Sequence, residues 1–149
     1  MSGLEHPELG STTILFVDDD PILREFAGVH LASNQLRVET AADGAEGFAR
    51  ACEGRHDLIL TDLEMPGLDG FGLIRRLRAE RVTHHTPILV QTSREDVASI
   101  DASYRAGADG FVLKPLNWRL LTLQIAFTMR AARMRRDLLA YGALRRAAG

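Results

Sequence analysis

Short apolar stretches alternate with longer amphipathic ones along most of this 149-residue chain. Four of the short stretches are rich in β-branched or aromatic residues and are predicted to be strands: Thr13–Val17, Asp57–Thr61, Pro87–Gln91 and Gly110–Leu113. A weaker candidate, Leu36–Thr40, alternates between apolar and polar residues. Three of the strong stretches show little alternation, which is typical of parallel strands covered on both faces.

The segments between these strands have apolar residues at helical spacing and begin with capping residues. Asp20 followed by Pro21 predicts the start of the first helix. The later helices are expected to begin at Asp43 (with Glu46 as a capping box), Asp69, Ser93 with Asp96, and Asn117. Strand and helix thus alternate five times, which predicts the α/β class with a doubly wound parallel sheet.

The fifth helix is predicted to be unusually long. Helix-forming residues continue from Asn117 to about Ala148, and apolar residues recur at coiled-coil-like spacing at Ala131, Met134, Leu138, Tyr141 and Leu144. An isolated helix with an apolar stripe needs a partner. Two interpretations remain open for residues 130–149: a dimerising signalling helix that leads toward an output domain, or a long helix folded back on its own domain.

Composition excludes several classes of protein. Apolar residues make up 46% of the chain, which fits a globular protein, and no apolar run approaches the ~20 residues of a membrane span. Residues 1–12 lack the features of a signal peptide and are interpreted as a flexible leader. The single cysteine, Cys52, permits no intramolecular disulfide and fits a reducing, cytoplasmic compartment.

Charge gives little sign of a nucleic-acid partner. The net charge is −2, although the last twenty residues contain six arginines and one acid, Asp137. We interpret these arginines as a solvated helix face. Of the 18 basic residues, Lys114 is the one lysine.

Chemically useful side chains stand at the ends of several predicted strands. Asp18, Asp19 and Asp20 follow the first strand, Asp62 follows the third, and Thr92 and Lys114 follow the fourth and fifth. The carboxyl ends of parallel strands meet at one edge of an open sheet, where ligands bind. We assign Asp20 to capping, because Pro21 follows it, which leaves Asp18, Asp19 and Asp62 as candidate metal ligands.

These residue types suit phosphoryl chemistry. A site of a few carboxylates and water suits Mg²⁺, which then takes phosphate oxygens to complete its shell. Phosphoryl transfer needs mainly positioning and charge neutralisation, and a carboxylate is a competent nucleophile. A hydroxyl at Thr92 and an ammonium at Lys114 can contact the remaining phosphoryl oxygens.

The motifs at these strand ends resemble the receiver domain of two-component response regulators over residues 13–129. The matching pieces are ILFVDDD (14–20), LILTDLEMPGLDG (58–70), PILVQTS (87–93) and GADGFVLKPL (107–116). The resemblance implies a flavodoxin-like, five-stranded parallel sheet of order 2-1-3-4-5, extended here by the long C-terminal helix. It also implies a phosphorylation-dependent signalling switch rather than an enzyme acting on a separate substrate, one that catalyses its own phosphoryl transfer and slow autodephosphorylation.

The resemblance assigns a role to each central residue. Asp62 is the expected phosphoacceptor, and the backbone carbonyl of Glu64 is an expected metal ligand. Asp18 and Asp19 are the acidic pair expected to hold Mg²⁺, Asp19 directly and Asp18 largely through water. Lys114 is the expected ion-pair partner, with a cis bond to Pro115. Thr92 is expected to move to the phosphoryl group and Phe111 to swing inward behind it.

Partners are implied in the same way. The phosphodonor is expected to be a sensor histidine kinase or a histidine phosphotransfer protein. Phosphorylation is expected to change the face formed by the fourth helix, fifth strand and fifth helix, which controls an unknown output domain or target. That face or the C-terminal helix is expected to form a homodimer. Glu64 and Arg94, two residues after Asp62 and Thr92, are expected to pair over the phosphoryl group and prolong its lifetime.

Two other functions are considered. The strand followed by Asp18-x-Asp20 also resembles the start of haloacid-dehalogenase-type phosphatases, in which Asp18 would be the nucleophile and Asp20 the general acid. That interpretation leaves Asp62 and the Met65-Pro66 loop unexplained. The second is an interaction module that keeps the fold but no longer accepts phosphate.

Overall fold

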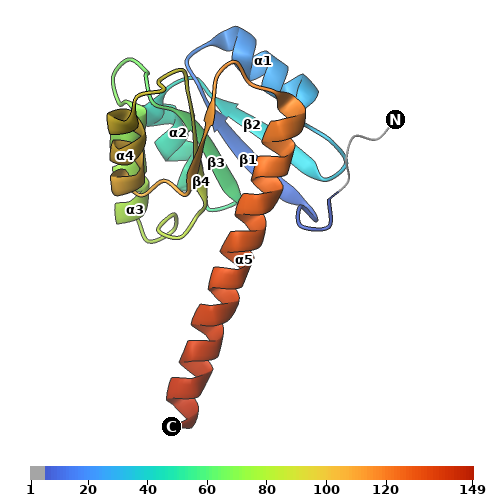
Figure 1. The fold of residues 1–149 in the computed structure, drawn as a ribbon, viewed down its shortest axis with the longest axis vertical. Helices are drawn as coiled ribbons and strands as arrows, with labels where there is room; N and C mark the ends of the chain where they lie inside the picture. Colours follow the sequence, from blue (N-terminus) through green and yellow to red (C-terminus); the bar gives the residue numbers. More distant parts are fainter. Residues whose placement is uncertain (1–5) are drawn as a thin grey trace.

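A computed structural model describes residues 6–149 of the chain, in which five strands and five helices alternate (Figure 1). The strands are β1 (Thr12–Val17), β2 (Leu36–Ala41), β3 (Leu58–Asp62), β4 (Ile88–Thr92) and β5 (Gly110–Leu113). The helices are α1 (Pro21–His30), α2 (Gly44–Ala51), α3 (Gly70–Ala79), α4 (Val97–Ala106) and α5 (Trp118–Ala148). The predicted strands are all present, with ends shifted by at most one residue.

The five strands form one parallel sheet in the order β2-β1-β3-β4-β5, as predicted. Val17 at the end of β1 pairs with Thr61 of β3, and Asp62 pairs with Gln91 of β4. The residues after these strands therefore emerge side by side at one edge of the sheet. This register brings distant parts of the sequence to a single place.

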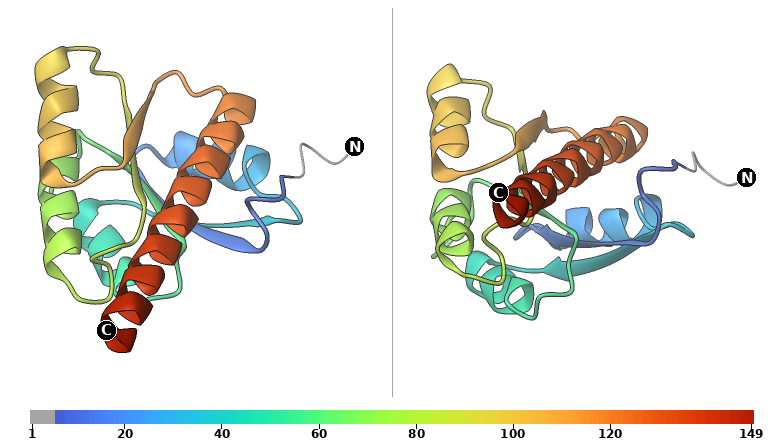
Figure 2. Two further views of the ribbon diagram at one scale, coloured as in Figure 1. Left: turned by 60° about the horizontal axis from the view of Figure 1, so that its bottom comes forward. Right: turned by 90° about the horizontal axis from the view of Figure 1, so that it is seen from below.

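Two apolar clusters cover the two faces of the sheet. One joins alternate residues of β1, β3 and β4 to α1 and α5, and it includes Phe16, Leu60 and Ile125. The other joins the intervening residues to α2 and α3, and it includes Val17 and Leu73. Figures 1 and 2 show α5 and the α2–α3 pair on opposite sides of the sheet. Burial on both faces explains why β1, β3 and β4 lack strict alternation.

Aspartate side chains cap the first four helices. Asp20, Asp43 and Asp69 accept backbone N–H groups of the first turns of α1, α2 and α3, as predicted. For α4 the cap is Asp96, which accepts from the N–H of Ser99 at 2.8 Å, and Ser93 lies outside the helix. Gly107 ends α4 in the left-handed conformation that glycine favours (φ 119°).

The long fifth helix is a single element that leaves the domain (Figure 1). Its first half packs on the sheet through buried residues that end at Ala132, and residues 133–148 are nearly all exposed. In this structure residues 133–148 extend from the domain and do not fold back on it. Within residues 6–149, none of the helices combines the length and apolar character that crossing a bilayer requires.

The region predicted to be a flexible leader is partly packed. Residues 1–5 lie outside the described part of the chain. Leu9 is buried in the α1–α5 cluster, and His6 exchanges two hydrogen bonds with Gln35. The described end of this region thus differs from the expectation of a free leader, because an apolar side chain at Leu9 finds a place in the core.

Candidate functional site

Three carboxylates meet at the edge of the sheet where β1 and β3 end. Asp18, Asp19 and Asp62 each offer an oxygen atom, and these atoms lie within 4.8 Å of one another. The Lys114 ammonium, at the end of β5, lies 2.8 Å from Asp18 Oδ2 and 3.0 Å from Asp62 Oδ2. The structure therefore brings together four of the residues that the sequence singled out.

The three consecutive aspartates after β1 have different surroundings. Asp18 is fully buried, and both of its carboxylate oxygens accept hydrogen bonds from the protein. Asp19 is exposed, and its carboxylate accepts no hydrogen bond within residues 6–149. Asp20 accepts from the N–H of Ile22 at 2.9 Å, which confirms its capping role. Asp19 is thus the exposed member of the acidic cluster whose whole carboxylate is open to a ligand.

Asp62 is buried, with 8% of its surface exposed. Burial raises the pKa of the Asp62 carboxyl above its usual value, and the negative charge of Asp18 raises it further. The Lys114 ammonium lowers this pKa but does not outweigh burial. Burial would lower the pKa of Lys114, but its hydrogen bonds and charge interactions with Asp18 and Asp62 outweigh burial and raise it. Lys114 is therefore held in its charged form.

The donor set fits Mg²⁺. In this part of the chain, three carboxylates face one ammonium, so two negative charges have no cationic partner when all three acids are ionised. A divalent cation would balance them and would offset the raised pKa of Asp62. Hard oxygen ligands from few carboxylates, with open space beside Asp19 and Glu64, are the surroundings that Mg²⁺ prefers.

The other predicted site residues lie around this cluster. The backbone N–H of Glu64 donates to Asp62 Oδ1 at 3.3 Å, and the side chain of Glu64 forms an ion pair with Arg94. The Thr92 hydroxyl is buried and accepts from the N–H of Arg94 at 3.0 Å. Phe111 is 43% exposed and lines an apolar groove with Val97 and other residues of α4. The bond between Lys114 and Pro115 is cis.

Two contacts to Asp18 were not anticipated. Gln91, fully buried in β4, donates from Nε2 to Asp18 Oδ2 at 3.1 Å, and Arg24 of α1 donates to the Asp18 carbonyl oxygen at 2.8 Å. An amide inside an otherwise apolar strand was the available signal for Gln91, since such a side chain needs a polar partner. Arg24 gave no comparable signal, because arginine on a helix is ordinarily solvated.

The comparison with protein families agrees with the site geometry. The family model described as "Response regulator receiver domain" matches residues 14–126. Among curated proteins, the transcriptional regulatory protein AfsQ1 of Streptomyces coelicolor is 35% identical over 133 residues, which cover 89% of this chain and 58% of that protein. ResD of Bacillus subtilis, also a transcriptional regulatory protein, is 32% identical, with coverage of 84% and 51%. The chain thus spans only about half the length of these relatives.

A solved structure of similar extent is chemotaxis protein CheY4 of Vibrio cholerae. It superposes with a TM-score of 0.76 and 31% identity, covering 80% of this chain and 99% of that one. The sheet order, the acidic cluster and the family match over residues 14–126 are mutually consistent. We conclude that this chain belongs to the response regulator receiver domain family of two-component signalling.

Proposed function

We propose that Asp62 accepts a phosphoryl group from a phosphohistidine of a sensor histidine kinase or a histidine phosphotransfer protein. The observation that carries this proposal is the Lys114 ammonium held between Asp18 and Asp62 beside the exposed Asp19. A carboxylate oxygen of Asp62 attacks phosphorus, the bond from phosphorus to histidine nitrogen breaks, and the histidine leaves with the electron pair. The product is an acyl phosphate on Asp62.

Charge neutralisation is the main task of the surrounding residues. Lys114 is already within hydrogen-bond distance of Asp62, so little movement brings it to a phosphoryl oxygen. Asp19, Asp62 and the carbonyl of Glu64 would hold Mg²⁺ directly, with Asp18 behind them. Bound there, Mg²⁺ would supply positive charge to the phosphoryl oxygens. The protected position of Asp18 favours an indirect role, because its oxygens are already occupied by protein donors.

The switch is proposed to act through Thr92 and Phe111. The Thr92 hydroxyl is held by the N–H of Arg94, and Phe111 is partly exposed, an arrangement that suits the state before phosphorylation. The new phosphoryl group draws Thr92 toward it and Phe111 fills the vacated space. This biases two pre-existing arrangements of the face made by α4, β5 and α5.

The protruding part of α5 is proposed to pair with a second copy of the chain. Met134, Leu138 and Tyr141 are each at least 60% exposed and continue a stripe that includes the exposed Phe127. Spacings of four and three residues are those with which two copies of one helix interlock.

The output domain or target of the switch stays unassigned. We propose that the protein acts in the cytoplasm.

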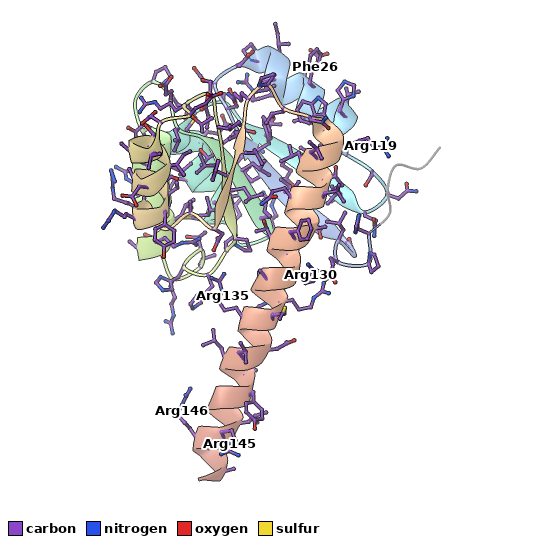
Figure 3. The ribbon with its side chains drawn as sticks, viewed as in Figure 1. Phe26, Arg119, Arg130, Arg135, Arg145 and Arg146 are labelled. Atoms are coloured by element: carbon purple, nitrogen blue, oxygen red, sulfur yellow. The ribbon has the colours of Figure 1, made fainter. Side chains whose placement is uncertain are left out.

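The arginines of α5 do not favour a nucleic-acid site. Figure 3 shows Arg130, Arg135, Arg145 and Arg146 spread along the helix rather than gathered on the domain. Arg135 lies 3.5 Å from Asp109, and Arg133 forms an ion pair with Glu8 at 3.0 Å. These two contacts lie where the helix leaves the domain and favour a structural role for the basic residues there.

The central test is phosphorylation of the intact chain by a small phosphodonor. With acetyl phosphate and Mg²⁺, the wild type is expected to gain one phosphoryl group in intact-mass spectrometry, whereas Asp62→Asn gains none because its amide is not a nucleophile. Chelation of Mg²⁺ is expected to reduce the wild-type rate at least tenfold. Asp57→Asn, which changes an acid at the opposite end of β3, serves as the control and keeps the wild-type rate. Full phosphorylation of Asp62→Asn would end the proposal.

A further inference from the structure

A buried glutamine stands beside the acidic cluster. Gln91 is completely buried, and the strand register places it opposite Asp62 on the neighbouring strand. Its Nε2 atom donates to Asp18 Oδ2, which lies 73 residues earlier in the chain. The residues before it in β4, Leu89 and Val90, are apolar members of the two core clusters. An apolar side chain would therefore fit this position if packing were the only requirement.

Gln91 is one of three donors that hold the Asp18 carboxylate. The N–H of Asp20 donates to Oδ1 at 2.8 Å, while Lys114 at 2.8 Å and Gln91 at 3.1 Å both donate to Oδ2. Of these three, Lys114 also binds Asp62. The Lys114 contact is thus shared with the acid that reacts, whereas the contacts from Asp20 and Gln91 belong to Asp18 alone.

The orientation of the Gln91 amide follows from the charge of Asp18. An ionised carboxylate can only accept hydrogen bonds, so the NH₂ end of the amide faces Asp18. The Oε1 atom is then buried without a hydrogen-bond donor in the described part of the chain. A buried acceptor without a partner costs folding free energy. The Gln91 amide thus leaves one polar atom without a partner while it supplies a hydrogen bond to the buried Asp18 carboxylate.

We propose that Gln91 is a positioning residue for phosphoryl transfer, which holds the Asp18 carboxylate in place while Lys114 shifts toward the phosphoryl group on Asp62. This inference rests on the proposed function. Without Gln91, Asp18 Oδ2 has Lys114 as its one remaining donor among the described residues, so this oxygen loses its support when the ammonium moves, and the N–H of Asp20 alone still holds Oδ1. Supporting side chains that orient metal-linked carboxylates commonly affect metal affinity and rate by about 10- to 100-fold.

The first experiment replaces Gln91 with an apolar residue of similar length. Gln91→Met is expected to bind Mg²⁺ alone about 10-fold more weakly in calorimetric titration, and to take up phosphate from acetyl phosphate about 10-fold more slowly. Its thermal midpoint without Mg²⁺ is expected to stay close to that of the wild type, because removal of the unpaired Oε1 offsets loss of the hydrogen bond to Asp18. Leu89→Met, on the same strand and the same core face, is the control and is expected to keep the Mg²⁺ affinity and the phosphorylation rate within about twofold of the wild type.

A second variant tests whether Gln91 acts through Asp18. In an Asp18→Asn background, the Gln91→Met change is expected to alter Mg²⁺ affinity less than twofold, because the carboxylate that it positions is gone. An equal loss in both backgrounds would overturn the inference, since it would indicate a general structural effect. So would wild-type Mg²⁺ affinity and rate in Gln91→Met itself.

A measurement on the wild type keeps the inference testable if Gln91→Met does not fold. The side-chain NH₂ resonances of Gln91 in ¹⁵N-correlated NMR are expected to exchange slowly with solvent and to shift when Mg²⁺ is added. Rapid exchange, or no shift at saturating Mg²⁺, would overturn the inference. A wild type that neither binds Mg²⁺ nor accepts phosphate would instead refute the proposed function, so the two failures are distinguishable.

Discussion

At the scale of single residues, surroundings rather than residue type decide the role of each acid. Asp18, Asp19 and Asp20 are chemically identical neighbours, yet one is buried among three donors, one is exposed, and one caps α1. The capping role was predictable because Pro21 follows Asp20. The family resemblance also anticipated different roles for Asp18 and Asp19, but the contacts that hold Asp18 were not predictable, because Gln91 and Lys114 lie far away in the sequence.

The Glu64–Arg94 ion pair belongs to this scale and gives a kinetic prediction. The two side chains line a hollow together with Asp19 and are 55% and 42% exposed. We expect this pair to shield the acyl phosphate from water, so replacing both residues with alanine speeds dephosphorylation about fivefold. An exposed ion pair contributes about 1 kcal/mol, and lowering the barrier to hydrolysis by that amount gives about a fivefold change in rate. Decay of phosphorylated protein in Mg²⁺ buffer measures this. Arg105→Ala, an exposed change on α4, is the control, and equal decay in all three proteins would contradict the prediction.

Glu39 gives a prediction about pH. Partial burial would raise the pKa of its carboxyl, but hydrogen bonds and charge interactions with His56 and Arg55 outweigh burial and lower it. A carboxyl whose pKa is lower in the folded state stabilises the protein above its unfolded pKa, and this contribution is lost as pH falls through the folded pKa. Glu39→Gln is therefore expected to lower the free energy of unfolding by about 1 kcal/mol at pH 7.

The difference between Glu39→Gln and the wild type should narrow toward zero as the pH falls well below the ordinary glutamate pKa. Urea denaturation at neutral and acidic pH measures both values. Glu53→Gln, which changes a 49%-exposed carboxylate that also contacts Arg55, is the control, with an expected change of less than about 0.5 kcal/mol. An unchanged difference at acidic pH would show that the loss does not arise from ionisation of Glu39.

At the scale of elements, helix starts were predictable because caps are local. The N-cap aspartates of α1, α2 and α3 precede their helices in the sequence and accept hydrogen bonds within two or three residues. At α4 the prediction named Ser93 with Asp96, and the structure confirms Asp96, because the path of the chain after β4 places Asp96 at the first turn of the helix. Propensity alone does not distinguish two capping residues three positions apart.

Gly70 at the start of α3 gives a prediction at the element scale. A Cβ atom there would lie 2.1 Å from the carbonyl oxygen of Asp62 and 2.7 Å from Leu63 Cα, so the β3–α3 loop would have to move. Gly70→Ala is expected to lower the free energy of unfolding by about 2 kcal/mol and to slow phosphorylation of Asp62. Thermal or urea unfolding measures the first effect.

Gly28 in α1 provides the matched control, because a Cβ there would meet no atom within 4 Å. Alanine is a better helix former than glycine, so Gly28→Ala is expected to raise the free energy of unfolding by about 0.5–1 kcal/mol. Similar effects of both substitutions would show that the close approach at Gly70 is relieved without cost.

At the scale of the whole molecule, α5 has two parts with different tasks. The part up to Ala132 covers the sheet, and the part beyond it extends away from the domain (Figures 1 and 2). An exposed apolar stripe on an extended helix is unfavourable in water unless another surface covers it. This supports the proposal that a second copy of the chain is the partner.

Leu138→Glu tests this pairing. Leu138 is 70% exposed and lies in the middle of the stripe, so a charge there is expected to convert a dimer into a monomer without lowering the thermal midpoint of the domain. Light scattering with Mg²⁺ and beryllofluoride, and without them, measures the mass. Ala143→Glu, an exposed change off the stripe, is expected to leave the dimer intact. A wild type that is monomeric under both conditions would refute the pairing.

The sequence by itself determined the order of elements, the helix caps and the acids at the strand ends. These features depend on side-chain spacing and on contacts within a few residues, which can be recognised locally. Tertiary structure alone decided that Lys114 bridges Asp18 and Asp62, that Gln91 reaches Asp18, and where the packed part of α5 ends. The contacts of Lys114 and Gln91 join residues 52 to 96 positions apart, so they arise only from the register of strands that are not consecutive in the chain. The end of the packed part of α5 depends instead on how far the sheet extends beneath the helix.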